Sequence, residues 1–369
     1  MPTIDLTLDY LPPKPPKSDY GIGCIGAGFI MRDCHLVAYN NAGYKVVAIA
    51  SRTRARAEET AQVRGVPKVY DTYREVIEDP AVEIIDIAVP PDNQRDVVRQ
   101  VCEFGKGKIK GILAQKPLGM NVAEAKEVVD LCTAAGIMLA VNQNMRYDQS
   151  VRACKSLLQK GVFGEPVLAT IEMRAIPHWM PWQERLGWVT LRIMSIHHLD
   201  TFRFWFGNPE RVFCSVRPDP RTLQKFDHTD GICLYILEYE SGLRCAAWDD
   251  VWAGPSREGA GSDLYIKWRV EGTEGLAWGT IGWPAYPNRQ PSTLHFTTRQ
   301  QPNVWFHPQW DAVWFPDAFE GPMAQLMTAI YHHSEPEISG HDNLDTMALV
   351  DAAYRSAAEH RAVSLKEVK

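Results

Sequence analysis

The sequence predicts an α/β fold in its first part and an α+β fold, built on a mostly antiparallel sheet, in its second. Up to Ser150, short apolar runs alternate with amphipathic stretches, which is typical of βαβ units and a parallel sheet. After Ser150, strand-like runs follow one another with a period of two, which indicates an antiparallel sheet with one covered face. A glycine-rich turn, Gly26-Ala27-Gly28, directly follows the first apolar run, as in Rossmann domains.

These periods define the expected elements. In the first part, strands are expected at Gly21–Ile25, Tyr44–Ala50, Ile84–Ala88, Gly111–Ala114 and Met138–Val141, and helices at Thr53–Arg64, Asn93–Phe104 and Val122–Ala135. In the second part, strands are expected at Val167–Arg174, Arg211–Val216, Gly231–Glu240, Leu243–Val251 and Asp263–Val270, and helices at Ile196–Phe206 and Asn343–Glu359.

Three domains follow from this pattern. A Pro-rich arm is expected over residues 1–18, a Rossmann dinucleotide-binding domain over residues 19–146, and an α+β substrate-binding and oligomerisation domain over residues 147–369. The last helix, residues 343–359, carries one apolar stripe and is expected to pack back on the Rossmann domain.

The composition excludes several classes of protein. The 369 residues carry a net charge of −6 and no basic run, which argues against a nucleic-acid partner. No apolar run approaches the roughly 18 residues needed to cross a membrane, and the first residues lack the apolar segment of a secretory signal. The eight cysteines form no C-x-x-C pair, so we expect reduced core thiols in a cytoplasmic protein.

The glycine turn predicts a nicotinamide dinucleotide, NAD(P), as cofactor. Gly26 permits the tight turn, Gly28 lets the backbone approach a pyrophosphate, and the helix that begins at Phe29 and Ile30 directs its positive end at that charge. Met31 replaces the third glycine of the G-x-G-x-x-G motif, so the prediction depends on the position of the turn in the first βαβ unit.

The end of the second expected strand gives a slight preference for NADP. An acid there would bind a free ribose 2′-hydroxyl, but this strand ends with Ser51 and Arg52. Arg52 would pair with a 2′-phosphate, although Ser51 would also hydrogen-bond a ribose. Arg54 is interpreted as part of a solvated helix face.

All twelve tryptophans lie between Trp179 and Trp314. Flat aromatic faces stack on sugars, and large aromatics also fill cores, which is the favoured interpretation for any single tryptophan. The segment Ile176–Trp188 has little strand pattern and places His178 beside Trp179, so these two residues are candidates for substrate binding.

Four patches of the chain resemble the Gfo/Idh/MocA family of sugar and inositol oxidoreductases. They are Gly26-Ala27-Gly28, Val89-Pro90-Pro91, Gln115-Lys116-Pro117 and His197-His198-Leu199-Asp200, and Ala353–Ala357 resembles the closing helix of the family. The resemblance implies that Val89 and Pro90, with Asn93, lie near the nicotinamide. It also implies that Gln115 and Lys116 contact the cofactor, and that Lys116 and His197 are catalytic.

The chain also departs from the family pattern. Gln115 replaces the glutamate of the family's Glu-Lys-Pro signature, and Gln94 stands where the family often has histidine. Ile193 occupies the position of the aspartate four residues before the family's histidine. The resemblance therefore carries over Lys116, His197 and Asp200, without a complete Lys-Asp-His triad.

The oxidation of a secondary alcohol requires a hydride acceptor and a proton acceptor that titrates near the working pH. His197 meets the second requirement directly. Lys116 acts either as a neutral base or as a cation that stabilises an alkoxide, and a positive nicotinamide would depress its pKa. We expect Lys116 to contact the reacting hydroxyl and His197 to accept or relay the proton, with the base assignment left open between them.

Other polar residues are candidates for substrate binding. Asp200 shares a helix face with His197 and would orient the imidazole or bind a hydroxyl. Asn144, Arg146 and Tyr147 follow an expected strand end, where α/β sheets bind ligands; Arg146 would clamp the substrate or form a domain-interface salt bridge. Arg192 would mark an acidic substrate, although a solvated surface arginine is the favoured interpretation. No metal site is expected at His197-His198.

The preferred function is an NAD(P)-dependent oxidoreductase acting on a secondary hydroxyl of a sugar, sugar acid, glycoside or cyclic polyol. One alternative is a redox-neutral isomerase or glycoside-cleaving enzyme with tightly bound NAD(P), and another is a non-catalytic NAD(P)-binding regulatory protein. Because the expected antiparallel sheet needs a cover for its open face, a homodimer or homotetramer is predicted.

Overall fold

The computed structural model describes residues 8–254, 263–283 and 288–368, and these form parts of two compact units. The parallel-sheet unit consists of Pro12–Asn144 and Phe315–Met347. The antiparallel-sheet unit consists of Met1–Leu11, Met145–Trp314 and Ala348–Lys369. Each unit therefore combines segments that lie far apart in the sequence, and each is described by itself.

The parallel-sheet unit contains a six-stranded parallel sheet in the order β3-β2-β1-β4-β5-β6. Its strands are β1 (Ile22–Ile25), β2 (Val46–Ala50), β3 (Lys68–Tyr70), β4 (Ile84–Ile87), β5 (Gly111–Ala114) and β6 (Met138–Val141). Because both faces of a parallel sheet are covered, its inner strands are almost continuous apolar runs, and five of the six were predicted. The edge strand β3 was missed because its three residues carry no such run.

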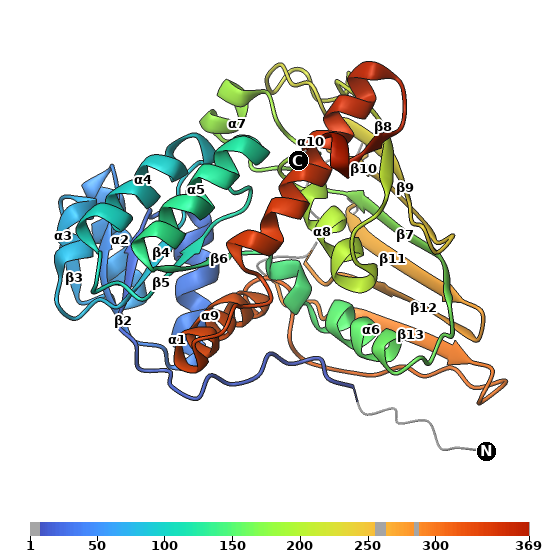
Figure 1. Cartoon of the computed structure of the whole chain (residues 1–369), viewed down its shortest axis with the longest axis horizontal. Helices are drawn as coiled ribbons and strands as arrows, with labels where there is room; N and C mark the ends of the chain where they lie inside the picture. Colours follow the sequence, from blue (N-terminus) through green and yellow to red (C-terminus); the bar gives the residue numbers. More distant parts are fainter. Residues whose placement is uncertain (1–7, 255–262, 284–287, 369) are drawn as a thin grey trace. The chain divides into compact units, whose positions relative to one another are not determined.

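Helices cover both faces of this sheet (Figure 1). One face carries α1 (Leu36–Ala42), α2 (Arg54–Arg64) and α9 (Glu320–His332), and the other carries α3 (Tyr73–Glu78), α4 (Pro91–Phe104) and α5 (Val122–Ala135). Helices α1, α2 and α5 each end at a glycine in the left-handed region, at Gly43, Gly65 and Gly136. Glycine adopts this conformation without a Cβ penalty, so these residues fix where the helices stop.

The antiparallel-sheet unit contains an eight-stranded sheet in the order β13-β12-β11-β7-β10-β9-β8-β14. Its strands are β7 (Pro166–Arg174), β8 (Arg211–Arg217), β9 (Ile232–Glu238), β10 (Arg244–Asp250), β11 (Tyr265–Gly272), β12 (Gly275–Thr280), β13 (Thr293–Thr298) and β14 (Val363–Ser364). Every neighbouring pair is antiparallel except β7 and β10, which run parallel. The predicted mostly antiparallel sheet is confirmed, but the parallel pair and the strands β12, β13 and β14 were not predicted.

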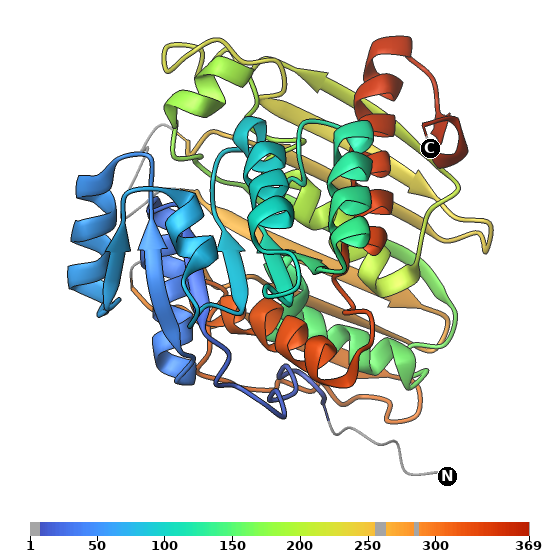
Figure 2. The same cartoon turned by 60° about the vertical axis from the view of Figure 1, so that its left-hand side comes forward.

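One face of this sheet is covered by α6 (Gln149–Gln159) and α8 (Ser195–Phe206), which Figure 2 shows lying across the strands. A short helix, α7 (Pro181–Leu186), lies in the connection between β7 and α8. On the open face, large apolar side chains are exposed at Leu168, Phe213, Leu234, Ile236 and Trp278. The last helix, α10 (Gly340–Glu359), begins in the parallel-sheet unit and ends in the antiparallel-sheet unit.

The eight cysteines are all buried and carry free thiols, as their scattered positions predicted. Among the described residues, no helix has the length and apolar character needed to cross a membrane.

Candidate active site

The glycine turn has the geometry of a dinucleotide cradle. Gly26 has a φ of +105°, and a Cβ there would lie 2.3 Å from the carbonyl oxygen of Ala88, so only glycine fits. Gly28 is exposed, and a Cβ there would meet no atom within 4 Å. Open space above an exposed glycine is what the close approach of a pyrophosphate requires, so these residues fit a dinucleotide.

The chain after this turn differs from the regular α-helix that was expected. Residues Ile30–His35 form a π-helical turn (η1), which then continues into α1. The amide of Arg32 donates to the carbonyl of Gly28 at 2.9 Å, while Met31 is completely buried. A π-helical turn is wider than an α-helical one. In this chain it contains Met31, the residue at the sequence position of the motif's third glycine. Phe29 and Ile30 remain at the helix N-terminus, whose first amide groups lack helical acceptors.

The end of β2 places an arginine beside the expected ribose site. Ser51 is half-buried and Arg52 is exposed, and Arg52 lies close enough to Tyr73 to act on its hydroxyl electrostatically. Arg54, in contrast, is held by Glu58 and Asp71 on an exposed surface. The interpretation of Arg54 as part of a solvated helix face is therefore confirmed.

Lys116 lies at the carboxyl edge of the parallel sheet. The strands β1, β4 and β5 run parallel, so the glycine turn after β1, the Val89-Pro90 loop after β4 and Lys116 after β5 all follow the same edge. Ligands bind at this edge in open α/β sheets. Desolvation lowers the pKa of Lys116 to about 7, so both protonation forms of its amine are present near neutral pH.

The segment around Lys116 is fixed by two glutamine side chains. Gln94, fully buried in α4, donates to the carbonyl of Gln115 at 2.5 Å and accepts from the amide of Gly119 at 3.1 Å. The Gln115 side chain accepts from the amide of Lys116 at 3.0 Å. Two of the three positions that depart from the family pattern therefore hold the segment of the lysine. Nearby, Asn93 lies half-buried in the first turn of α4 and donates to Asp92 at 2.9 Å.

A buried hydrogen-bond network in the same unit was missed by the sequence analysis. It joins His35, Tyr39, Asp86 and Asn142, all of which are almost completely buried. The signal was a single aspartate, Asp86, within the otherwise apolar run Ile84–Ile87, because a buried carboxylate requires hydrogen-bond donors.

Several candidate residues of the antiparallel-sheet unit form buried ion pairs. Arg146 donates to both oxygens of Asp200, at 2.6 Å from Nε and 2.7 Å from Nη2. Of the two interpretations of Arg146, the salt bridge is therefore observed, but within one unit and not at a domain interface. The carboxylate of Asp200 also lies 3.6 Å from Nη1 of Arg203, one turn further along α8. His197 lies on α8, buried, with the edge of its ring against Trp314 at 5.3 Å.

The interpretation of Arg192 as a solvated surface residue is wrong. Its side chain is only 7% exposed, and Nη2 lies 2.5 Å from Asp351. Its guanidinium lies 4.9 Å from the Trp188 ring and 5.1 Å from the Tyr354 ring. A carboxylate 159 residues further along the chain pairs with this arginine, which local sequence does not reveal.

The remaining candidates divide between packing and exposure. Trp179 packs edge to face with Phe226 at 5.2 Å, in a small apolar cluster with Val189 and Val251, so the packing interpretation applies to it. His178 beside it is exposed. Tyr147 is fully buried under the guanidinium of Arg152, and Asn144 is buried at the end of the parallel-sheet unit.

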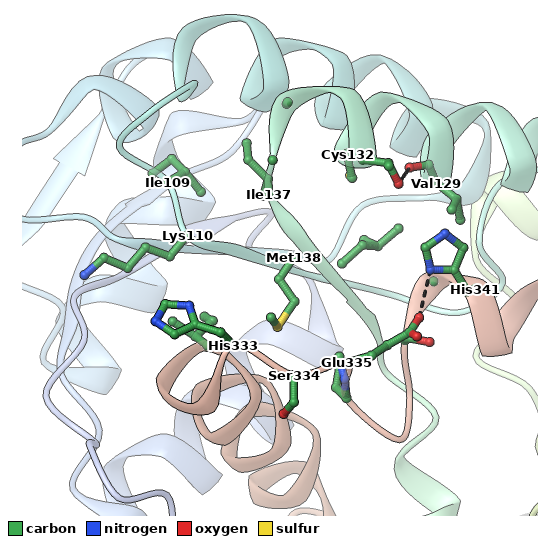
Figure 3. Close-up of a pocket in the computed structure, with 18 of the residues that line it drawn as sticks. Ile109, Lys110, Val129, Cys132, Ile137, Met138, His333, Ser334, Glu335 and His341 are labelled. Carbon is green, nitrogen blue, oxygen red and sulfur yellow. Dashed lines mark hydrogen bonds and ion pairs between the residues drawn. The ribbon is translucent and has the colours of Figure 1, made fainter.

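The parallel-sheet unit also contains a cavity of about 670 Å³ at the opposite edge of its sheet (Figure 3). Ile109 and Lys110 precede β5, and Ile137 precedes β6, so these lining residues lie at the amino ends of the strands. On the rim, His341 and Glu335 pair at 2.8 Å. Lys116 follows the carboxyl end of β5, so this cavity is separate from the dinucleotide cradle. No group of three or more metal-ligating side chains occurs among the described residues.

Comparisons with known proteins agree with this geometry. Residues 20–143 match the oxidoreductase family with an NAD-binding Rossmann fold, and residues 151–277 match the GFO/IDH/MocA C-terminal domain. The chain is 35% identical over 261 residues to the trans-1,2-dihydrobenzene-1,2-diol dehydrogenase of Oryctolagus cuniculus, covering 69% of this chain and 73% of the relative. The chain therefore belongs to the Gfo/Idh/MocA family and is an oxidoreductase that uses a nicotinamide cofactor.

Two further relatives span nearly the whole chain. The D-apiose dehydrogenase of Paraburkholderia graminis is 26% identical over 349 residues, covering 94% of this chain and 89% of the relative. A solved structure of levoglucosan dehydrogenase in complex with NADH superposes with a TM-score of 0.79 over 94% of this chain and 99% of that chain. At 20% identity, the latter likeness concerns the fold alone.

Proposed function

We propose that this oxidoreductase transfers a hydride between NAD(P) and a secondary hydroxyl of a sugar or a related polyol. The observation that carries the proposal is the position of Lys116 at the carboxyl edge of the dinucleotide-binding sheet, with its pKa lowered to about 7. The relatives named as D-apiose dehydrogenase and 1,5-anhydro-D-fructose reductase support the sugar as the substrate class.

The bound dinucleotide would supply the hydride acceptor, and the residues of the chain would handle the proton. In its neutral form, the Lys116 amine has a lone pair that accepts the proton of the reacting hydroxyl. Gln94 and Gln115 hold the backbone on either side of it, which keeps the amine in place. His197 is the second acid–base residue that we propose, for accepting or relaying the proton.

The first experiment measures absorbance at the reduced-nicotinamide band with NAD⁺ and NADP⁺ against inositols, aldoses, sugar acids and aryl glycosides. With one substrate class, we expect cofactor reduction that Lys116→Met lowers by about 10²–10⁴-fold, the usual contribution of a general base. Retained activity in Lys116→Met would refute the role of the lysine. Substrate consumption without net reduction would point to the redox-neutral alternative.

The exposed Arg52 supports a preference for NADP over NAD. Its guanidinium would pair with the 2′-phosphate, so Arg52→Ala should weaken NADP binding by about tenfold and leave NAD binding unchanged. Calorimetric titration of both dinucleotides measures this. Arg54→Ala is the matched control, because Glu58 and Asp71 hold that side chain. Tighter binding of NAD than of NADP by the wild type would contradict the preference.

The open face of the antiparallel sheet supports a homodimer or homotetramer. It exposes large apolar side chains, such as Phe213, Leu234 and Ile236, on neighbouring strands. We expect light scattering at micromolar concentration to give a multiple of the 41.6 kDa chain mass, and a monomeric mass would contradict this. The eight free thiols support a reducing compartment such as the cytoplasm.

A further inference from the structure

The buried network around His35 connects the helix after the glycine turn to the segment of Lys116. His35 lies on η1, directly before α1, and is 1% exposed. Its Nδ1 lies 2.6 Å from Oδ2 of Asp86 on β4. The same carboxylate oxygen accepts from the hydroxyl of Tyr39 at 2.7 Å. The ring of Phe319 packs against the imidazole of His35, with the two ring centroids 5.3 Å apart, so an aromatic neighbour also fixes the imidazole.

The second ring nitrogen points to the carboxyl ends of two neighbouring strands. Nε2 of His35 lies 2.8 Å from the amide nitrogen of Asn142, which follows β6, and 3.4 Å from the amide nitrogen of Gln115, which follows β5. Because the carboxylate of Asp86 can only accept, the ring proton lies on Nδ1, and Nε2 is left as the acceptor that faces the two NH₂ groups. Burial also raises the pKa of Tyr39, which keeps its hydroxyl a donor to that carboxylate.

Gln115 extends this chain to the lysine. Its Nε2 donates to His35, and its Oε1 accepts from the amide of Lys116. Each end of the Gln115 amide therefore has one partner, and the orientation of the amide is determined by the acceptor that His35 presents. If His35 presented a donor instead, the Gln115 amide would turn and lose its bond to the Lys116 backbone.

We propose that His35 is a positioning residue for Lys116, acting through the side chain of Gln115, with Asp86 fixing the tautomer that this requires. The proposal rests on the catalytic role of Lys116 proposed above. Its physical basis is that an error of about 1 Å in the placement of a catalytic group costs about 10²-fold in rate. The network holds the lysine segment to the sheet by side chains that do not contact the reacting atoms.

The first test compares two substitutions within the network. His35→Asn retains a donor to Asp86 and removes the acceptor for Gln115, whereas Tyr39→Phe removes a donor to the same carboxylate and a 3.2 Å contact to His35 Nδ1 but leaves the bond between His35 Nε2 and Gln115 in place. We expect His35→Asn to lower kcat by about 10–100-fold and Tyr39→Phe to change it less than threefold. Equal losses in both variants, or no loss in His35→Asn, would overturn the proposal.

The affinity for the dinucleotide distinguishes a positioning role of His35 from a loss of structure around the dinucleotide cradle. Calorimetric titration should give a Kd for the dinucleotide within threefold of the wild type in both variants, because the glycine turn lies outside the network. A Kd that rises more than tenfold in His35→Asn would mean that the network serves the dinucleotide cradle, and the proposal would fail.

A third measurement determines the tautomer of His35 in the wild-type protein. In protein with ¹⁵N-labelled histidine, the nitrogen shifts of His35, assigned by its loss in His35→Asn or by its Nδ1 coupling pattern, should show the Nδ1-protonated tautomer. The Nε2-protonated tautomer would overturn the proposal. This result is independent of catalysis, so an active Lys116→Met refutes the proposed catalytic role of the lysine, while the tautomer and the His35→Asn comparison decide the positioning role.

Discussion

The buried lysine of the parallel-sheet unit and the buried arginines of the antiparallel-sheet unit lie in different surroundings. In the parallel-sheet unit, desolvation lowers the pKa of Lys116 to about 7, and the side chains that hold its backbone are the neutral amides of Gln94 and Gln115. In the antiparallel-sheet unit, Arg146 pairs with Asp200, and Arg192 pairs with Asp351. A lysine that titrates near neutral pH is suited to proton transfer, whereas arginines held by carboxylates stay charged and stabilise the fold.

The largest effect that would test this contrast is on catalysis. If the neutral Lys116 amine is the base, kcat/KM for alcohol oxidation should rise about tenfold per pH unit below about pH 7 and level off above it, because deprotonation generates the active form. Lys116→Arg cannot lose its proton, so it should lower the plateau by about 10²–10⁴-fold and remove the inflection. Initial rates from pH 5.5 to 9 measure both.

His197→Gln is the control for this profile, because an ordinary histidine titrates in the same range. The inflection should persist in His197→Gln at a reduced rate. An inflection that disappears in His197→Gln and survives in Lys116→Arg would show that His197 and not Lys116 is the general base. The contrast between Lys116 and the paired arginines would then have no catalytic meaning.

The next effect is on stability. Arg146→Met leaves the buried carboxylate of Asp200 without its bidentate partner and should lower the free energy of unfolding by about 3–5 kcal/mol. The double substitution Arg146→Met with Asp200→Leu should recover part of this loss, because it removes the buried carboxylate that has lost its bidentate partner, while Arg203 keeps its bond to Asn208. Urea denaturation followed by tryptophan fluorescence reports on this unit, which holds all the tryptophans.

An exposed pair provides the comparison for that measurement. Arg54→Ala breaks the contacts to Glu58 and Asp71 on the surface, where an ion pair contributes at most about 1 kcal/mol. If Arg146→Met costs no more than this, the pair with Asp200 is not structural. It would then be available for ligand binding, as the sequence alone allowed.

The smallest expected effects concern the two glycines of the turn, Gly26 and Gly28, whose substitutions should affect different properties. Gly26→Ala should destabilise the fold by about 1–3 kcal/mol, because its φ is +105° and the new Cβ meets the Ala88 carbonyl. Gly28→Ala has open space and should leave the melting temperature unchanged, while it weakens dinucleotide binding by about tenfold. Calorimetry measures both quantities, and unchanged binding in Gly28→Ala would place the pyrophosphate elsewhere.

The amino-acid sequence by itself predicted the two fold classes and the use of a nicotinamide cofactor. Five strands of the parallel sheet and the glycine turn were predicted because apolar periodicity and turn chemistry are local properties of the chain. The same analysis missed the edge strand Lys68–Tyr70, which has no periodicity to detect, and the π-helical turn Ile30–His35, which follows from an irregular backbone path.

Only the tertiary structure decided which polar side chains meet. Asp200 pairs with Arg146 across 54 residues of sequence, and Arg192 pairs with Asp351 across 159. His35 reaches Gln115 across 80 residues, which turns a departure from the family signature into part of a network that holds the lysine segment. Such pairings depend on which distant segments the tertiary fold brings together. A buried polar group forms hydrogen bonds with the partners that this packing places within reach.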